Sequence, residues 1–456
     1  MMIIVTLCLI SLPGFVISKR IKTSDDYALG GRNAGALLVA GSIANTIVGG
    51  AATVGTAQGG FTNGLVAWWF TLGSGIALII MAIFYAKPLR LSGLTTISEY
   101  LVINYGSAAG PMASLSASLG IYFSLVASSL TAVHLIGILL GTSFLSSAVV
   151  IIVIVAGLVI LGGQGSNAVV GLLKFFLVVL TIFVGGFWAV GEVGGVNEMI
   201  LAFEDASRFS LLGKDIEASV ASLLSMIIGV ISTQSYVQAL YSAKDARAAA
   251  RGCALAAVAV IPVGIPSILI GMNVKLMHPE VQSIDALPYF MINSLPHWLG
   301  GIGLAVLIIS AVGSIAGLSL GIGTMISRDI FGGVLRINNS RALLNINRIV
   351  VLLVTALALV FVYYHLDSSV LQWNYLSMAL RGAGVFLPLT MVIFCKQWLL
   401  PRAGLMAMAA GIAVACSWRF LFPTGGNALF PSLLANAIFL FPSICYTYYR
   451  ITYGNK

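Results

Sequence analysis

The chain has 456 residues, of which 59% are hydrophobic and only 8% are charged, and its mean hydropathy is +1.05. A soluble protein of this length cannot cover so much apolar surface, so the composition excludes the soluble classes and indicates a polytopic membrane protein. We interpret the net charge of +9 as an orientation signal carried by loop lysines and arginines, not as a sign of nucleic-acid binding.

Apolar stretches long enough to cross the hydrocarbon core recur along the whole chain, and no carboxylate lies in the interior of any of them. The first stretch lacks an A-x-A-like cleavage site and is followed by Lys19 and Arg20, so we expect a transmembrane helix there and not a signal peptide. The sequence predicts an all-α protein with 13 spans at 1–18, 34–57, 65–86, 111–141, 145–162, 166–190, 217–238, 250–275, 298–328, 347–365, 369–395, 403–421 and 428–449.

The distribution of positive charge predicts the orientation of these spans. With the N-terminus outside, 17 lysines and arginines fall in cytoplasmic segments and only 4 fall outside, as the positive-inside rule requires. We therefore expect a cytoplasmic C-terminus and a multi-pass protein of the plasma membrane, the inner membrane of a prokaryote.

The spans form two groups of five, at 34–190 and 217–396, joined by an extracellular loop at 191–216. Because five is odd, the second group starts from the opposite side of the membrane, which is the topology of an inverted repeat. An extra helix and a cytoplasmic linker (1–33) precede the groups, and two extra helices (397–456) follow them.

The first span of each group has the composition of a broken helix. Gly49, Gly50 and Gly55 interrupt the first, and the run from Ser232 to Gln234 places polar residues in the middle of the other. Unwound backbone at that depth must line a cavity. The alternative is that these small residues only allow close helix packing.

Six sequence blocks resemble the sodium:solute symporter family, in the order expected for it. They are SDDYALGGR (24–32), GGFTNGL (59–65), SGLTTISEYL (92–101), QSYVQALYSAKDARAA (234–249), ALPYFMINSLPHWLGG (286–301) and MISRDIF (325–331). The resemblance implies a ten-helix inverted-repeat core like that of the bacterial leucine transporter. It also implies import of a small solute by alternating access, usually with sodium.

The resemblance implies a sodium site between the first and eighth core helices. Its oxygen ligands would be the carbonyls around Asn45 and Val48, the Ser310 carbonyl and the Ser314 hydroxyl, which suit a hard cation. Gly313 stands where many relatives have a second hydroxyl, so one ligand is absent. Apart from Na⁺ as the coupling ion, we expect no cofactor.

Lys174 is a second departure from the family pattern. It lies beside the position at which the family often carries an aspartate, well inside a span, where a lysine is costly unless it reaches the headgroups or finds partners. One interpretation is that the side chain reaches the headgroups. The other is that its ammonium occupies or adjoins the sodium site, which would make transport proton-coupled or uncoupled and independent of Na⁺.

The resemblance places the solute between the two broken helices. Tyr236 matches a tyrosine that caps the sugar in a galactose symporter. Ala51, Ala52 and Thr53 are smaller and less polar than the residues that bind hexoses, which argues against a hexose. The expected substrate-binding residues are Ala51, Ala52, Thr53, Thr233, Gln234, Tyr236 and Arg381.

Arg381 carries the main argument about the substrate class. It lies inside a span, and no span interior offers it a carboxylate, although buried charges are normally paired. Either helix carbonyls or an anionic solute compensates the positive charge of Arg381. The N-termini of half-helices also favour a carboxylate. We therefore expect a small organic acid or amino acid as the substrate.

Other classes of function fit poorly. An intramembrane enzyme needs an H-E-x-x-H motif, paired aspartates or a Ser-His arrangement at depth, and the sequence has none of these. Two broken helices favour occlusion over an open channel. We expect the bilayer and a small solute as partners, with no nucleic acid and no obligate protein partner.

Overall fold

The structure, a computed structural model, describes residues 32–161, 164–337, 339–421 and 427–453. Throughout these ranges the regular structure is helical, and a single isolated bridge pairs Ala34 with Ala243. The helices are α3 (Ala36–Ile47), α4 (Thr56–Asn63), α5 (Trp69–Ile80), α6 (Ala86–Leu91), α7 (Ile97–Tyr105), α8 (Ala109–Leu140), α9 (Phe144–Leu161), α10 (Gln164–Glu192), α11 (Val196–Ala202), α12 (Ile216–Ile231), α13 (Gln234–Ser242), α14 (Ala246–Val260), α15 (Gly264–Met277), α16 (Ala286–Asn293), α17 (His297–Met325), α18 (Ser340–Tyr363), α19 (Val370–Cys395), α20 (Pro401–Leu421) and α21 (Leu429–Tyr453).

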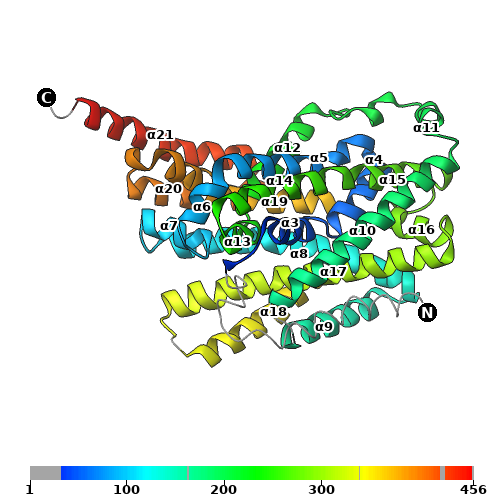
Figure 1. The fold of residues 1–456 in the computed structure, drawn as a ribbon, viewed down its shortest axis with the longest axis horizontal. Helices are drawn as coiled ribbons and strands as arrows, with labels where there is room; N and C mark the ends of the chain where they lie inside the picture. Colours follow the sequence, from blue (N-terminus) through cyan, green and yellow to red (C-terminus); the bar gives the residue numbers. More distant parts are fainter. Residues whose placement is uncertain (1–31, 162–163, 338, 422–426, 454–456) are drawn as a thin grey trace.

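Short 3₁₀ and π segments join several of these helices. The π segments are η2 (Ala51–Gly55), η4 (Met81–Tyr85) and η8 (Ile326–Val334), and the 3₁₀ segments are η3 (Gly64–Trp68), η5 (Ala206–Phe209), η6 (Ile261–Val263), η7 (Ser283–Asp285) and η9 (Lys396–Trp398). The long helices run roughly along one direction (Figure 1). We call the end with α6, α7 and α13 the α7 end, and the end with α4, α15 and α16 the α16 end.

Every expected span from residue 34 onward overlaps one of these helices or a pair of them. By length and composition, the described residues contain eight helical stretches able to cross a membrane, or nine if the bent pair α12–α13 counts as one. The shorter apolar helices at Ala36–Ile47 and Phe144–Gly157 do not meet this criterion on their own. The expected span at 1–18 lies outside the described residues.

Both expected helix breaks are present. Helix α3 ends at Ile47, and Val48 leaves the helical conformation with φ −82° and ψ 71° before η2 begins at Ala51. Glycine is needed here because neighbours approach closely: a Cβ on Gly49 would lie 2.8 Å from Ser314 Oγ, and one on Gly50 would lie 2.8 Å from Thr131 Cγ2. The turn therefore lies directly against α17 and α8.

The second break has a different local cause. Helices α12 and α13 meet at an angle of 43°. The Ser232 hydroxyl donates to the Ile228 carbonyl at 2.8 Å, and the Thr233 hydroxyl donates to the Gly229 carbonyl at 2.6 Å. Hydroxyls that bond the preceding turn compete with the helical ladder and bend a helix. The Ser-Thr pair thus satisfies the last carbonyls of α12 where the helix stops.

The segment between α10 and α12, expected only as a loop, carries α11 and η5 and covers part of the α16 end. Trp69 Nε1 donates to the Leu211 carbonyl at 2.7 Å, and Arg208 Nη1 donates to the Phe61 carbonyl at 3.2 Å. Gly64, with φ 77°, lies so close to the Arg208 backbone that a Cβ would be 2.2 Å from its carbonyl oxygen. These contacts hold the segment over the end of α4.

Helices α4 and α15 pack backbone to backbone. A Cβ on Gly271 would lie 2.0 Å from the Ala57 carbonyl oxygen, and one on Gly60 would lie 2.6 Å from the Ile268 carbonyl oxygen. Because the obstructing atoms belong to the backbone, no side-chain rotation relieves the overlap. Small residues at such crossings are what allow membrane helices to approach closely.

We predict that Gly271→Ala destabilises the protein by about 1–3 kcal/mol, the usual cost of overpacking a close contact. Thermal unfolding of the purified protein in detergent should show a lower midpoint. Gly157→Ala is the matched control, since a Cβ there meets no atom within 4 Å. Equal midpoints for the two variants would show that α4 and α15 do not pack this tightly.

Candidate functional site

Two polar centres lie beside the helix breaks. One joins the turn after α3 to the middle of α17 and to α10. The other joins the break between α12 and α13 to α8 and α19. Both are built from elements far apart in the sequence, so their contacts depend on the tertiary packing.

The first centre brings together the residues expected to hold sodium. Ser310 Oγ donates to the Val48 carbonyl at 3.2 Å, and Ser314 Oγ donates to the Ser310 carbonyl at 2.8 Å. Ser310 is fully buried. The unwound carbonyls of the first break therefore face the hydroxyl side of α17, and this oxygen-rich set fits a hard cation such as Na⁺.

Gly313 lies on α17 beside these residues, and a Cβ at this position would meet no atom within 4 Å. The space that a second hydroxyl would occupy is thus open.

Lys174 enters the same centre from α10. Its side chain is 5% exposed, and Nζ donates to the Asn45 carbonyl at 3.4 Å. The Asn45 amide oxygen Oδ1 is buried without a hydrogen-bond partner. The ammonium therefore does not reach toward the headgroups, which was one of the two interpretations, but lies at one of the expected sodium ligands.

The second centre is built around Arg381 on α19. It is 2% exposed, and it donates from Nη1 to Thr233 Oγ1 at 3.0 Å and from Nη2 to Ser124 Oγ and Ser377 Oγ at 2.8 Å each. Its Nε is buried without a partner. Helix carbonyls were one of the two interpretations for Arg381; here hydroxyls of α8, of α19 and of the break between α12 and α13 hold its guanidinium.

The protons of these three hydroxyls point away from the guanidinium. Thr233 donates to the Gly229 carbonyl, Ser124 to Asn374 Oδ1 at 3.1 Å and Ser377 to the Gly120 carbonyl. Each hydroxyl therefore presents a lone pair to Arg381. In the described part of the chain no carboxylate lies within salt-bridge distance of Arg381, so the charge is hydrogen-bonded but not neutralised.

Gly120 on α8 explains how the arginine fits. A Cβ at this position would lie 2.3 Å from Arg381 Cγ and 2.7 Å from the Ser377 carbonyl oxygen. Only glycine leaves room for the aliphatic part of Arg381 between α8 and α19. Nothing in the local sequence around Gly120 indicates this role, so sequence reasoning missed it.

The other expected substrate residues occupy varied places. Tyr236 is 4% exposed and lies on α13, three residues after Thr233, whose hydroxyl accepts from Arg381. Ala51 and Ala52 are buried in η2, and the Thr53 hydroxyl donates to the Gly49 carbonyl at 3.0 Å. Thr53 therefore supports the turn, and Tyr236 is the residue of this group that accompanies Arg381.

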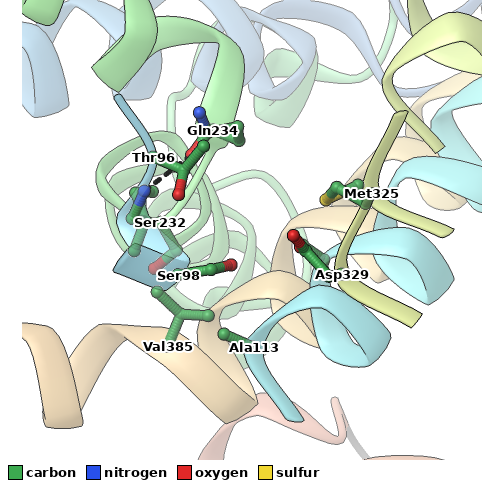
Figure 2. Close-up of a pocket in the computed structure, with 10 residues that line it drawn as sticks. Thr96, Ser98, Ala113, Ser232, Gln234, Met325, Asp329 and Val385 are labelled. Atoms are coloured by element: carbon green, nitrogen blue, oxygen red, sulfur yellow. Dashed lines mark hydrogen bonds between the residues drawn. The ribbon is translucent and has the colours of Figure 1, made fainter. Parts of the chain in front are cut away.

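Gln234 has a structural task that the sequence did not suggest. Its Oε1 accepts from the Ile97 amide at 2.9 Å, and its Nε2 donates to the Thr95 carbonyl at 3.3 Å. Both ends of the amide are thus bonded to the backbone at the start of α7 (Figure 2). This side chain clamps α13 to α7 at the α7 end.

Gln58 makes the corresponding clamp at the α16 end, and sequence reasoning missed it. Its Oε1 accepts from the Val370 amide at 3.0 Å, and its Nε2 donates to the Ser368 carbonyl at 3.2 Å. The side chain is 4% exposed. A lone glutamine in an apolar half-helix was the only available signal. Each broken helix is therefore tied to the start of another helix by one glutamine.

We predict that the two clamps hold opposite ends of the molecule closed. In a variant without native cysteines, with Ala52→Cys as reporter, Gln58→Ala should speed labelling from the α16 end by roughly tenfold. Gln234→Ala should speed labelling from the α7 end similarly, because each loses two hydrogen bonds. Labelling rates with a membrane-impermeant thiol reagent, in vesicles of both orientations, measure this.

Gln372→Ala is the control for the clamp experiment, since Gln372 is exposed on α19 and its side chain makes no clamp of this kind. The interpretation fails if the two clamp variants change labelling from the same end, or if the control changes it as strongly as they do.

A protein-family model, the sodium:solute symporter family, matches residues 27–411. The chain is 25% identical to the high affinity choline transporter 1 of Homo sapiens over 96% of this chain and 78% of that protein. It is 24% identical to the corresponding transporter of Caenorhabditis elegans, over 89% of this chain and 72% of the relative.

Two solved structures share the fold. A Na⁺-coupled sialic acid symporter in a substrate-bound outward-open state aligns with a TM-score of 0.79 at 17% identity, over 98% of this chain and 96% of that one. MhsT in complex with L-phenylalanine aligns with a TM-score of 0.55 at 16% identity, over 90% and 99%. Because the family model matches most of its length, this chain belongs to the sodium:solute symporter family and is a multi-pass membrane transporter, not an enzyme.

Proposed function

We propose that this protein is a secondary active transporter that imports a small carboxylated solute, such as an organic acid or an amino acid, together with Na⁺ by alternating access. The core would consist of two inverted five-helix repeats, α3–α10 and α12–α19. The α7 end would face the cytoplasm, with the N-terminus outside and the protein in the plasma membrane.

The buried guanidinium of Arg381 carries the proposal for the substrate class. Three hydroxyls solvate it, and no carboxylate of the described residues lies within salt-bridge distance of it. A carboxylate on the solute would supply the missing charge through a charge-assisted hydrogen bond, which is the strong kind in a low-dielectric site. Tyr236 would then cover the solute from the side of α13.

The choline transporters among the relatives act on a cation, which makes choline the natural competing substrate. The charges at the site favour an anion. Arg381 and Lys174 are both buried beside the helix breaks, and a quaternary ammonium placed near them would be repelled. The relatives and the site thus support different solutes, and transport assays decide between them.

Sodium coupling is supported by the family and by the oxygen ligands around Val48, Ser310 and Ser314. Lys174 favours a second candidate, in which its ammonium replaces the ion and transport is proton-coupled or uncoupled. The observation behind it is the 3.4 Å contact of Nζ with the Asn45 carbonyl, a group that would otherwise ligate Na⁺.

We predict that proteoliposomes accumulate at least one labelled carboxylate in a saturable manner, and that choline does not compete. Arg381→Gln should reduce uptake at low solute concentration roughly 10- to 100-fold, because a hydrogen bond to a charged group contributes about 1.5–3 kcal/mol. Arg381→Lys should recover only part of this loss, since an ammonium lacks the planar fork.

Arg402→Lys, an exposed arginine on α20, serves as the control for uptake and for the amount of folded protein. Saturable choline uptake that is unaffected by Arg381→Gln would overturn the proposed substrate class.

We predict that Na⁺ raises the thermal unfolding midpoint of the purified protein saturably when N-methyl-D-glucamine keeps the ionic strength constant. A ligand at a hundredfold excess over its Kd stabilises the folded state by about 2.7 kcal/mol. Ser314→Ala should reduce the rise, and K⁺ should not reproduce it.

The second candidate makes a different forecast for the same measurement. If the ammonium of Lys174 has replaced the ion, Ser314→Ala leaves the response of the parent protein to Na⁺ unchanged, and a response that depends on Ser314 appears only in Lys174→Ala. Insensitivity of both proteins would contradict sodium binding at this centre altogether.

A further inference from the structure

A pocket lies at the α7 end, next to the break between α12 and α13. Thr96 and Ser98 of α7, Ser232 and Gln234 of the break, and Met325 and Asp329 at the end of α17 line it (Figure 2). Val385 lines it from α19, one helical turn beyond Arg381, and residues four apart share a helix face. The pocket therefore adjoins the proposed solute site on its α7 side.

Asp329 is the acidic residue among those that line the pocket, and it is half-buried. Its carboxylate accepts a hydrogen bond from the Ser114 hydroxyl. Ser98 Oγ lies 3.3 Å from Ser114 Oγ and lines the same pocket, so a second hydroxyl stands behind the one that contacts the carboxylate. The adjacent Arg328 is exposed, so water screens its charge.

The backbone around Asp329 is unusual. It belongs to η8, a π-helical segment over Ile326–Val334 that continues directly from α17. Such segments are rare and occur frequently at functional sites, because the extra residue in each turn redirects the side chains. Here the carboxylate accepts a hydrogen bond from Ser114 of α8, and Asp329 and Ser98 of α7 line the same pocket (Figure 2).

The same helix connects this pocket to the first polar centre. Ser314 precedes Asp329 by 15 residues in a continuous helical run, which is about 22 Å at the rise of an α-helix. A cation that leaves Ser314 toward the α7 end would travel along α17 and meet the carboxylate of Asp329 there.

We propose that Asp329, with the hydroxyls of Ser98 and Ser114, forms a second site for a monovalent cation, Na⁺, at the α7 end. A half-buried carboxylate gains from a cation, and carboxylate and hydroxyl oxygens are ligands of hard cations. Binding at this site involves none of the residues of the first centre. Its part in transport rests on the proposed function.

The charge of Asp329 gives this site a role in the order of release. An anionic solute that passes from Arg381 through the pocket is repelled by a bare carboxylate and passes more easily when a cation neutralises it. The solute therefore leaves before the cation, and the cation is released last from Asp329 into the cytoplasm.

The test is equilibrium binding of ²²Na⁺ to the purified, full-length protein. Ser314→Ala removes the side-chain ligand of the first centre, so the binding that remains reports the second site. We expect Asp329→Asn in this background to weaken the remaining binding at least tenfold. Asp367→Asn, an exposed aspartate between α18 and α19, should leave it within twofold. Asp329→Glu, which keeps the charge, should retain part of it.

Four outcomes overturn the proposal. The first is ²²Na⁺ binding to Ser314→Ala that Asp329→Asn leaves unchanged. The second is an equal loss in Asp329→Asn and Asp367→Asn. The third is that Ser314→Ala binds no ²²Na⁺ at all. The fourth is that tryptophan fluorescence changes with pH and not with Na⁺, and that Asp329→Asn abolishes this change. Failure of the first centre to bind Na⁺ appears separately, as equal binding by the parent protein and Ser314→Ala.

Discussion

The structure depends on one constraint of the bilayer, which is that backbone polar groups without helical partners must be satisfied within the protein. The chain breaks two helices in mid-membrane, and each break meets this constraint in its own way. After α3, the Val48 carbonyl accepts from Ser310 on α17. After α12, the hydroxyls of Ser232 and Thr233 bond the last carbonyls of their own helix. Both polar centres form where side chains of other helices contact these breaks.

The two buried cations give these centres an electrostatic character that is unusual for a sodium-coupled transporter. Lys174 contacts the backbone of the first break and Arg381 contacts the hydroxyl of the second. Both charges donate hydrogen bonds, yet within the described ranges no acidic side chain forms a salt bridge with either of them. Two uncompensated positive charges favour an anion and weaken the affinity for any further cation nearby. In the proposed function, the substrate class and the coupling ion would therefore be linked through this pair of side chains.

Gln58 and Gln234 connect the centres to the ends of the molecule. Each has both ends of its amide bonded to backbone groups at the start of another helix. The clamps hold the half-helices against their neighbours, and alternating access would require that only a modest free energy separates clamped from open arrangements. On the α7 side, Gln234 and Asp329 line the same pocket.

The sequence by itself determined the class of the protein, the order of its helices and the positions of both breaks. These follow from local properties: runs of apolar residues, glycines at 49 and 50, and hydroxyls at 232 and 233. It also identified Lys174 and Arg381 as charges in need of partners. Only the tertiary structure decided the partners, because the rotation and register of packed helices set which side chains meet. Ser124 accepts a hydrogen bond from Arg381, and Gly120 leaves room for its side chain. Both lie more than 250 residues from Arg381 in the sequence, beyond the reach of any local pattern.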